Sequence, residues 1–411
     1  MPLTCFHFLF DTPVSTNEKM AGMSDVIVQQ RPSTHSMEAP SFNNRLTGGP
    51  GQNFKSIYPT KLPAVPEEIT KEWLSSVLGL EVQSLHRTNE LPGTATKLYV
   101  TAKTADGERR MCIKGGFNPA FIQQMPWIVM IYQREVEFFN RIAPLLSDMD
   151  LPTAWWAGHT PTQGIVVMED LASRGCQFGS PVATWPVDRV RAGVEQLAVL
   201  HAKTWGVRPA DYPWLTSDYD QALLTLMQTY DAVVSGPDRP AVHAYLRDQA
   251  RVTAVLKKHY DARNPKFQCL LHGDAHVGNA YLEAGAPRFL DWQMIHIGSA
   301  FHDVSYFVAG ALTVDDRRAH EWEIVDHYLA TLAKHGGAKG LLSSDEDVRT
   351  EYRKSFLAGI GWIMCPYEMQ PRDCVHAMAT RYATAIDDHK VLELVESLPG
   401  PKAASSSCTV M

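Results

Sequence analysis

The 411-residue sequence has no apolar run that approaches the roughly 20 residues of a membrane-spanning helix. Its seven cysteines include no Cys-x-x-Cys pair and several lie within apolar stretches, so we expect free buried thiols and no disulfide framework. Basic residues are not in excess, since the formal net charge is −7, and nothing therefore points to nucleic acid as a partner. With 45% hydrophobic and 20% charged residues, the composition is that of a folded, soluble protein, which we expect in the cytoplasm.

What the sequence does contain is enough chain for about two lobes and their tails. Residues 1–55 are dominated by Pro, Ser, Asn, Gly and Gln and are predicted to be a disordered leader, and residues 400–411 a flexible tail. Between them, residues 56–170 are predicted to form a small lobe that contains strands. Residues 171–399 are predicted to form a larger, mainly helical lobe.

The predicted small lobe combines a hairpin with one helix and a buried strand. Apolar strands at residues 97–102 and 110–114 flank a turn at residues 105–107, which is a hairpin signal. Helical spacing of apolar residues predicts a helix over residues 128–146. A continuous apolar run predicts a buried strand over residues 164–170.

In the predicted large lobe a short hairpin interrupts the helices. Apolar residues at helical spacing predict a helix over residues 187–205, ended by Gly206, and a last helix over residues 378–394. Between these two helices, residues 279–282 and 288–290 are predicted to pair as a hairpin.

Polar side chains gather at the two ends of this hairpin. The chain reads His272-Gly273-Asp274-Ala275-His276-Val277-Gly278-Asn279 where it enters the hairpin and Asp291-Trp292-Gln293 where it leaves. Phosphoryl transfer from ATP needs a carboxylate near the acceptor hydroxyl and oxygen ligands for Mg²⁺, because there is little covalent chemistry to assist. Asp274, Asn279 and Asp291 supply these groups, and the interval from Asp274 to Asn279 is that of the protein-kinase catalytic loop.

These residues resemble the aminoglycoside phosphotransferase and choline-kinase-like (CHK) family of small-molecule kinases, over roughly residues 65–395. The family's His-Gly-Asp-x-His-x-x-Asn stands intact at residues 272–279, and its Asp-[Trp/Phe]-[Glu/Gln/Asp] at residues 291–293. Residues 196–206 resemble the family's Leu-Ala-x-Leu-His-Ala helix. The resemblance implies an α+β, protein-kinase-like bilobal fold, with a small mixed β-sheet N-lobe, a larger mainly helical C-lobe and ATP bound between them.

The resemblance also implies roles for individual residues of the motif. Carried over by position, Asp274 would be the catalytic base, and Asn279 and Asp291 would be the Mg²⁺ ligands. His272 would brace the loop, and Asp303 would support it through buried hydrogen bonds.

Lys114, at the end of an apolar strand, resembles the lysine that contacts the α- and β-phosphates of the nucleotide in kinases. That design needs a glutamate from the following helix to hold the lysine in place. Glu135 is preferred because family members often read Arg-Glu-x-x-Phe at this place, and Glu137 is the alternative. Taken alone, a lysine after an apolar strand is usually just solvated.

Two further segments are assigned to the nucleotide by their position. The turn with Gly93 and Thr94 lies where a loop that covers the phosphates is expected, although a plain surface turn explains it almost as well. Met168 and Glu169 stand at the predicted lobe boundary and would form the interlobe hinge beside adenine. The simpler interpretation of this pair is a strand end with an ordinary acidic residue.

The predicted reaction is the ATP- and Mg²⁺-dependent phosphorylation of a hydroxyl group on a small molecule; the identity of this acceptor and the oligomeric state are left open. Two alternatives stay open: a non-catalytic kinase-like binding protein, and a metal-dependent hydrolase with His272, Asp274 and His276 as ligands. His276 could equally contact substrate or be a packed core residue. The last four residues match a prenylation motif, so membrane association is expected only if Cys408 is prenylated, and would then be weak.

Overall fold

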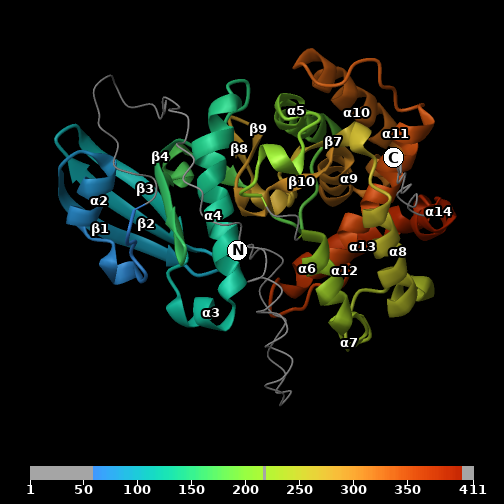
Figure 1. Cartoon of the computed structure of the whole chain (residues 1–411), viewed down its shortest axis with the longest axis horizontal. Helices are drawn as coiled ribbons and strands as arrows, with labels where there is room; N and C mark the ends of the chain where they lie inside the picture. Colours follow the sequence, from blue (N-terminus) through green and yellow to red (C-terminus); the bar gives the residue numbers. More distant parts are fainter. Residues whose placement is uncertain (1–58, 216–218, 400–411) are drawn as a thin grey trace, which may run out of the picture.

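The computed structural model describes residues 59–215 and 219–399. The predicted leader and tail, with Cys5 and Cys408, lie outside the described residues. Figure 1 shows a sheet on the left, a larger helical part on the right, and helix α4 (Val129–Glu137) between the two. An antiparallel sheet followed by a mainly helical region is the arrangement of the protein-kinase-like fold, so the predicted fold class is confirmed.

Five antiparallel strands form the N-terminal sheet, in the order β1-β2-β3-β5-β4. They are Val82–Leu91 (β1), Thr96–Thr104 (β2), Gly107–Gly115 (β3), Ala154–Thr160 (β4) and Gln163–Glu169 (β5). Because every neighbouring pair is antiparallel, the prediction of a mixed sheet is wrong in this detail. The predicted hairpin is confirmed as β2–β3, and Gly107 in its turn has a φ of 116°, which favours glycine.

Sequence periodicity finds some of these strands and misses others. In β2 the buried Leu98, Val100 and Ala102 alternate with more exposed neighbours and pack toward helix α2 (Lys71–Leu78). Strand β4 has no counterpart in the sequence-based prediction, because its residues do not alternate between apolar and polar. The predicted strand over residues 164–170 is present as β5, which pairs with β3 on one side and with β4 on the other.

The helix predicted over residues 128–146 is present but changes its winding along its length. Helix α4 is followed by a π-helical turn, Phe138–Ile142, and a 3₁₀ turn, Ala143–Leu145. The π turn begins where Phe138 stacks on Trp292, with 3.9 Å between ring centroids. Single π turns inside helices occur frequently at functional sites.

Helices make up most of the chain after residue 170. The longer ones are α5 (Val187–Lys203), α8 (Gln249–Asp261), α9 (Ala300–Ala311), α10 (Val314–Lys334), α11 (Glu346–Ser355) and α13 (Arg372–Asp388). The shorter ones are α6 (Tyr219–Leu226), α7 (Tyr230–Val234), α12 (Ile360–Ile363) and α14 (Val391–Ser397), and α3 (Pro119–Gln124) lies in the N-terminal part. The predicted helix over residues 187–205 is thereby confirmed as α5.

Two small sheets interrupt these helices. One consists of β6 (Gln177–Phe178), β8 (Ala280–Glu283) and β9 (Ala286–Phe289), and the other of β7 (Gln268–Leu271) and β10 (His296–Ser299). The predicted hairpin between the two motifs is confirmed as β8–β9.

The single helix predicted over residues 378–394 is wrong. Helix α13 ends at Asp388 and α14 begins at Val391, because Lys390 between them has a φ of 49°, in the left-handed region that ends a helix. The neighbouring His389 stacks on Phe356, with 4.8 Å between ring centroids. Tertiary packing of this kind leaves no local sequence signal.

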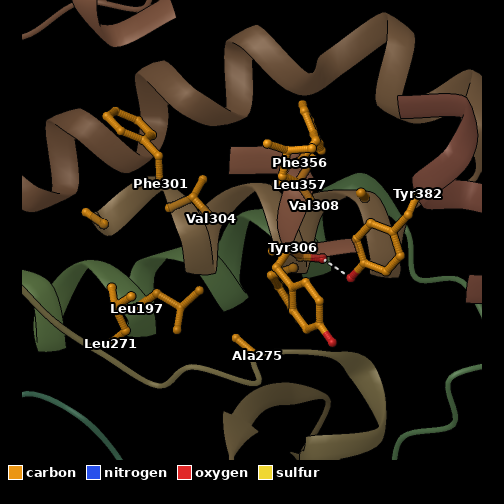
Figure 2. Close-up of a cluster of buried hydrophobic side chains, with 14 of the residues drawn as sticks. Leu197, Leu271, Ala275, Phe301, Val304, Tyr306, Val308, Phe356, Leu357 and Tyr382 are labelled. Carbon is orange, nitrogen blue, oxygen red and sulfur yellow. Dashed lines mark hydrogen bonds between the residues drawn. The ribbon is translucent and has the colours of Figure 1, made fainter. Parts of the chain in front are cut away.

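The core of the helical part gathers around α9. Figure 2 shows Phe301, Val304 and Tyr306 of this helix beside Leu197 of α5 and Leu271 of β7. All five side chains are buried. This packing fixes the end of β7, from which the histidine–glycine–aspartate motif continues.

The described residues also answer two expectations about composition. Their five cysteines are free and buried, which confirms the prediction for this part of the chain. No helix within residues 59–215 and 219–399 is long and apolar enough to cross a bilayer.

Candidate active site

The motif loop turns sharply directly after β7. Gly273 has a φ of 82°, and a Cβ added there would lie 2.2 Å from the carbonyl oxygen of Met294, so only glycine fits. Residues 277–279 then form one 3₁₀ turn, and His276 Nδ1 accepts a hydrogen bond from the Gly278 amide at 3.0 Å. The loop is therefore fixed by its own backbone on one side and by Met294 on the other.

Asp303 of α9 holds this loop in place through hydrogen bonds to its backbone. Its carboxylate accepts from the amides of His272 at 2.6 Å and Gly273 at 3.0 Å, and lies 3.1 Å from His201 Nε2. Burial alone would raise the pKa of Asp303, but the hydrogen bond and charge of His201 and the nearby histidines hold it well below its usual value. Asp303 is therefore a buried carboxylate that supports the loop, as predicted for it.

The carboxylate of Asp274 is held at both oxygens. Asn279 Nδ2 donates to Oδ2 at 2.9 Å, and the hydroxyl of Tyr306 donates to Oδ1 at 3.2 Å. The indole of Trp362 donates to the same Tyr306 hydroxyl at 2.7 Å. Tyr382 in turn donates to the Tyr306 carbonyl at 2.7 Å, the dashed contact in Figure 2. A chain of hydrogen bonds thus orients Asp274.

Sequence reasoning missed Tyr306 and Trp362. A signal for Tyr306 existed, because it follows Asp303 by three positions on α9, and residues at this spacing share a helix face. Trp362 lies in the short helix α12, and nothing in its local sequence points to Asp274. Only the packing of α12 and α13 against α9 brings it there.

Lys114 lies between two carboxylates. Its Nζ is 2.7 Å from an oxygen of Glu135 on α4 and 2.7 Å from Oδ1 of Asp291. The three side chains are no more than 4% exposed. The alternative partner, Glu137, pairs with His159 at 2.9 Å and with Arg141 instead.

Burial and charge compete at this ion network. Burial opposes the charged form of Lys114, but the carboxylates of Asp291 and Glu135 outweigh it and raise its pKa. Asp291 is also buried, yet the charge of Lys114 holds its pKa below the usual value. For Glu135, burial and the charge of Asp291 win over Lys114 and raise the pKa. Lys114 therefore offsets the negative charge of two buried carboxylates.

Trp292 links α4 to the motif at the end of β9. Its ring lies between Phe138, at 3.9 Å, and His272, at 4.6 Å between ring centroids. Its amide donates to Glu135 Oε1 at 3.2 Å. The preceding Asp291 has a φ of 68°, a strained backbone for a residue that is not glycine.

The turn assigned to the phosphates lies between β1 and β2, as expected from its position. Gly93 and Thr94 belong to it, Thr94 is buried, and its carbonyl accepts from the hydroxyl of Tyr132. Lys97, just beyond the turn, is paired with Lys114 across β2 and β3, and its charge contributes to the lowered pKa of Asp291. Sequence reasoning gave Lys97 no role, so the basic character of this corner was missed.

The residues assigned to the hinge lie at the end of β5. Met168 pairs with Cys112 of β3. The amide of Glu169 donates to the Thr153 carbonyl at 3.0 Å, and its carboxylate accepts from Arg174 at 2.6 Å. The Glu169 amide is therefore already engaged by the protein.

The hydrolase alternative finds no support in the arrangement of its three proposed ligands. His272 Nδ1 accepts from the Asp274 amide at 3.2 Å, while its Nε2 lies 3.1 Å from the Leu290 carbonyl, so both ring nitrogens are engaged. Burial lowers the pKa of His272 and keeps it neutral. Within the described residues, no group of three or more His, Cys, Asp or Glu side chains could hold a metal ion.

Residues 94–338, more than half of the chain, match the ecdysteroid kinase-like family, and the match includes the lysine, the motif loop and the second aspartate. The chain belongs to this family. This ecdysteroid kinase-like protein is accordingly a small-molecule kinase with an undetermined substrate. Membership in a kinase family implies that ATP is the phosphate donor. Comparison with curated proteins gives no match.

Several solved structures are similar to the chain. A macrolide 2′-phosphotransferase from Brachybacterium faecium has 18% identity and a TM-score of 0.42, over 75% of this chain and 96% of that chain. A choline kinase from Streptococcus pneumoniae has 17% identity and a TM-score of 0.43, over 79% and 98%. An amicoumacin kinase in complex with AMP-PNP and Ca²⁺ has 12% identity and a TM-score of 0.48, over 78% and 94%.

Proposed function

We propose that the protein transfers the γ-phosphoryl group of ATP, in the presence of Mg²⁺, to a hydroxyl group of a small molecule. One observation carries the proposal: Lys114, Glu135 and Asp291 meet in a buried ion network, and the β8–β9 hairpin joins Asp291 to the loop of Asp274 and Asn279. Phosphoryl transfer depends mainly on positioning and on electrostatic stabilisation, and these side chains supply both.

In this proposal the nucleotide is held chiefly by residues 56–170. Lys114 carries the positive charge for the α- and β-phosphates and Glu135 keeps it in place. The backbone of Gly93 and Thr94 covers the phosphates. Adenine lies beside Met168 and Glu169; since the Glu169 amide is engaged by Thr153, other backbone groups of the hinge contact the base.

Asn279 and Asp291 are the residues that would hold Mg²⁺. Both offer oxygen atoms, which Mg²⁺ prefers, and the amide of Leu290 donates to the Asn279 carbonyl at 3.0 Å, so the two residues stand at neighbouring places of one hairpin. The ion, once bound, would neutralise negative charge on the phosphates.

Asp274 receives or orients the proton of the acceptor hydroxyl. Asn279 and Tyr306 each donate to one of its oxygens, which fixes the direction of the carboxylate. His276 lies beside it, with Nε2 3.7 Å from Oδ2 of Asp274, fully buried and without a hydrogen-bond partner. Because His276 Nδ1 accepts a hydrogen bond from the Gly278 amide, the neutral ring carries its proton on Nε2. Nε2 can therefore donate a hydrogen bond to the hydroxyl oxygen of the substrate.

The test is Mg²⁺-dependent release of ADP across a panel of hydroxylated small molecules, with mass spectrometry for an added phosphate. Asp274→Asn and Asp291→Asn should each abolish turnover. The matched control is Asp315→Asn, at an aspartate that is 97% exposed, and it should leave turnover unchanged. ATP binding without any phosphorylated product would overturn the proposal in favour of a non-catalytic binding protein, as would wild-type activity in Asp274→Asn.

A further inference from the structure

A separate cavity of about 330 Å³ lies between α10, α11 and the junction of α13 with α14. Its volume falls at the lower end of the range for small-ligand pockets. In Figure 1 helices α10 and α11 lie at the upper right of the helical part, on the side away from the sheet. Besides Trp322 and His389, the side chains around it are four arginines and two carboxylates: Arg317, Arg318, Arg349, Arg353, Glu321 and Asp388.

The two carboxylates are fully occupied by two of the arginines. Asp388 accepts two hydrogen bonds from Arg318, at 2.8 and 2.9 Å, and also pairs with Arg317. Glu321 accepts from Arg317 at 3.0 Å and lies 3.1 Å from His389 Nε2. Arg317 and Arg318 are therefore neutralised within the wall of the cavity.

The other two arginines have no such compensation. Within residues 59–215 and 219–399, no carboxylate forms an ion pair with Arg349 or Arg353, although both are half-buried. Both are nevertheless held: Arg349 lies over the ring of Trp322 at 3.9 Å, and Arg353 donates to the His389 carbonyl at 2.6 Å. Two fixed positive charges thus face one cavity in a chain whose net charge is −7.

We propose that this cavity binds a small phosphate-bearing anion through Arg349 and Arg353. A guanidinium presents paired N–H donors in a plane that matches phosphate oxygens, and two of them can neutralise a dianion. Because Trp322 and the His389 carbonyl already restrain both arginines, little side-chain entropy is lost on binding. This site does not depend on the proposed kinase reaction.

The first experiment is calorimetric titration of the full chain with inorganic phosphate at constant ionic strength. A non-hydrolysable ATP analogue is present to occupy the nucleotide site. The double variant Arg349→Gln/Arg353→Gln should bind phosphate at least about tenfold more weakly, since each hydrogen bond to a charged group contributes about 1.5–3 kcal/mol and 1.4 kcal/mol is tenfold. The control is Arg208→Gln, at an exposed arginine paired with Asp211, and it should bind like the wild type.

A second arm of the titration separates the two sources of phosphate. Glycerol 3-phosphate binding more tightly than inorganic phosphate identifies a phosphate monoester as the ligand, and the reverse order identifies the free ion. Equal affinity in the wild type and the double variant, or no binding to the wild type, overturns the proposal.

A measurement on the wild type alone tests the site even if the double variant does not fold. Phosphate should slow the modification of Arg349 and Arg353 by phenylglyoxal, read by peptide mass spectrometry, and leave that of Arg208 unchanged. If phosphate leaves the modification rates of all three arginines unchanged, the site is refuted.

Discussion

Replacing Lys114 by methionine removes the cation that touches both carboxylates of the buried network. Nζ lies 2.7 Å from Glu135 and 2.7 Å from Asp291, and all three side chains are no more than 4% exposed. Removing one partner of a buried ion pair costs about 3–5 kcal/mol, because the remaining charge is buried and uncompensated. We therefore expect the free energy of unfolding of Lys114→Met to fall by about 3–5 kcal/mol at pH 8.

The loss should shrink as the pH falls. Without Lys114, the burial that already raises the pKa of Glu135 is no longer opposed by a lysine, and the Glu135–Asp291 pair binds one proton in the folded variant. A glutamate of the unfolded chain binds its proton only near about pH 4.3. Between the Glu135 pKa of the folded wild type and the higher pKa of the folded variant, only the variant holds the extra proton, so its stability relative to the wild type rises by up to about 1.4 kcal/mol per pH unit on acidification.

Urea denaturation followed by tryptophan fluorescence, between pH 8 and pH 5.5, measures this difference. The matched control is Lys354→Met, which removes a buried lysine 2.9 Å from Glu351, outside the proposed site. Both variants should lose stability, but only Lys114→Met should also lose ATP turnover. A loss below about 1 kcal/mol for Lys114→Met at pH 8, or a gap that widens toward acid, would refute the reasoning.

Three further predictions concern the loop and its surroundings. Tyr306→Phe should lower kcat about tenfold, with the KM for ATP unchanged, because it removes one hydrogen bond to the proposed base; Tyr230→Phe, at a buried tyrosine elsewhere, is the control in steady-state kinetics. Gly273→Ala should abolish activity and lower the melting temperature, because its Cβ would meet the Met294 carbonyl, and a wild-type melting curve would contradict this. Burial, with the charge of a neighbouring histidine, lowers the pKa of His296 to about 3. Below about pH 6.5 only the unfolded chain therefore gains a proton at this residue, which destabilises the folded wild type. Between pH 7.5 and 5.5 the free energy of unfolding, measured by urea denaturation, should fall by about 1.4 kcal/mol less in His296→Gln than in the wild type.

The fold class and the main motif residues could be predicted from the sequence because their signals are local. Asp274 and Asn279 stand in one short loop, and Asp291 follows the next strand but one along the chain. The β2–β3 hairpin and α5 were predictable for the same reason, since each shows a period of two or of about 3.6 residues within one segment. Lys114 was proposed from its resemblance to the kinase lysine that ends an apolar strand and precedes a helix with a glutamate.

What the sequence did not predict depends on contacts between distant segments. Trp362 reaches Tyr306 only because α12 and α13 pack on α9, and Lys97 reaches the ion network only through the register of β2 and β3. Strand β4 pairs with β5 without any alternation of its own. The break at Lys390 comes from packing around the C-terminal helices rather than from a glycine or proline. Periodicity cannot report such contacts, because they are set by the tertiary structure.

A single carboxylate joins the two halves of the proposed site. Glu135 Oε1 accepts from Lys114 at 2.8 Å and from the Trp292 amide at 3.2 Å, and the ring of that tryptophan lies against Phe138 of the π-helical turn that follows α4. A displacement of α4 would therefore move the lysine proposed for the phosphates and the segment that follows Asp291 at the same time. Because Lys114 also donates to Oδ1 of Asp291, a metal ion or nucleotide bound at the proposed site would compete with that contact. The position of α4 therefore affects both the lysine proposed for the nucleotide and the segment next to the aspartate proposed for the metal.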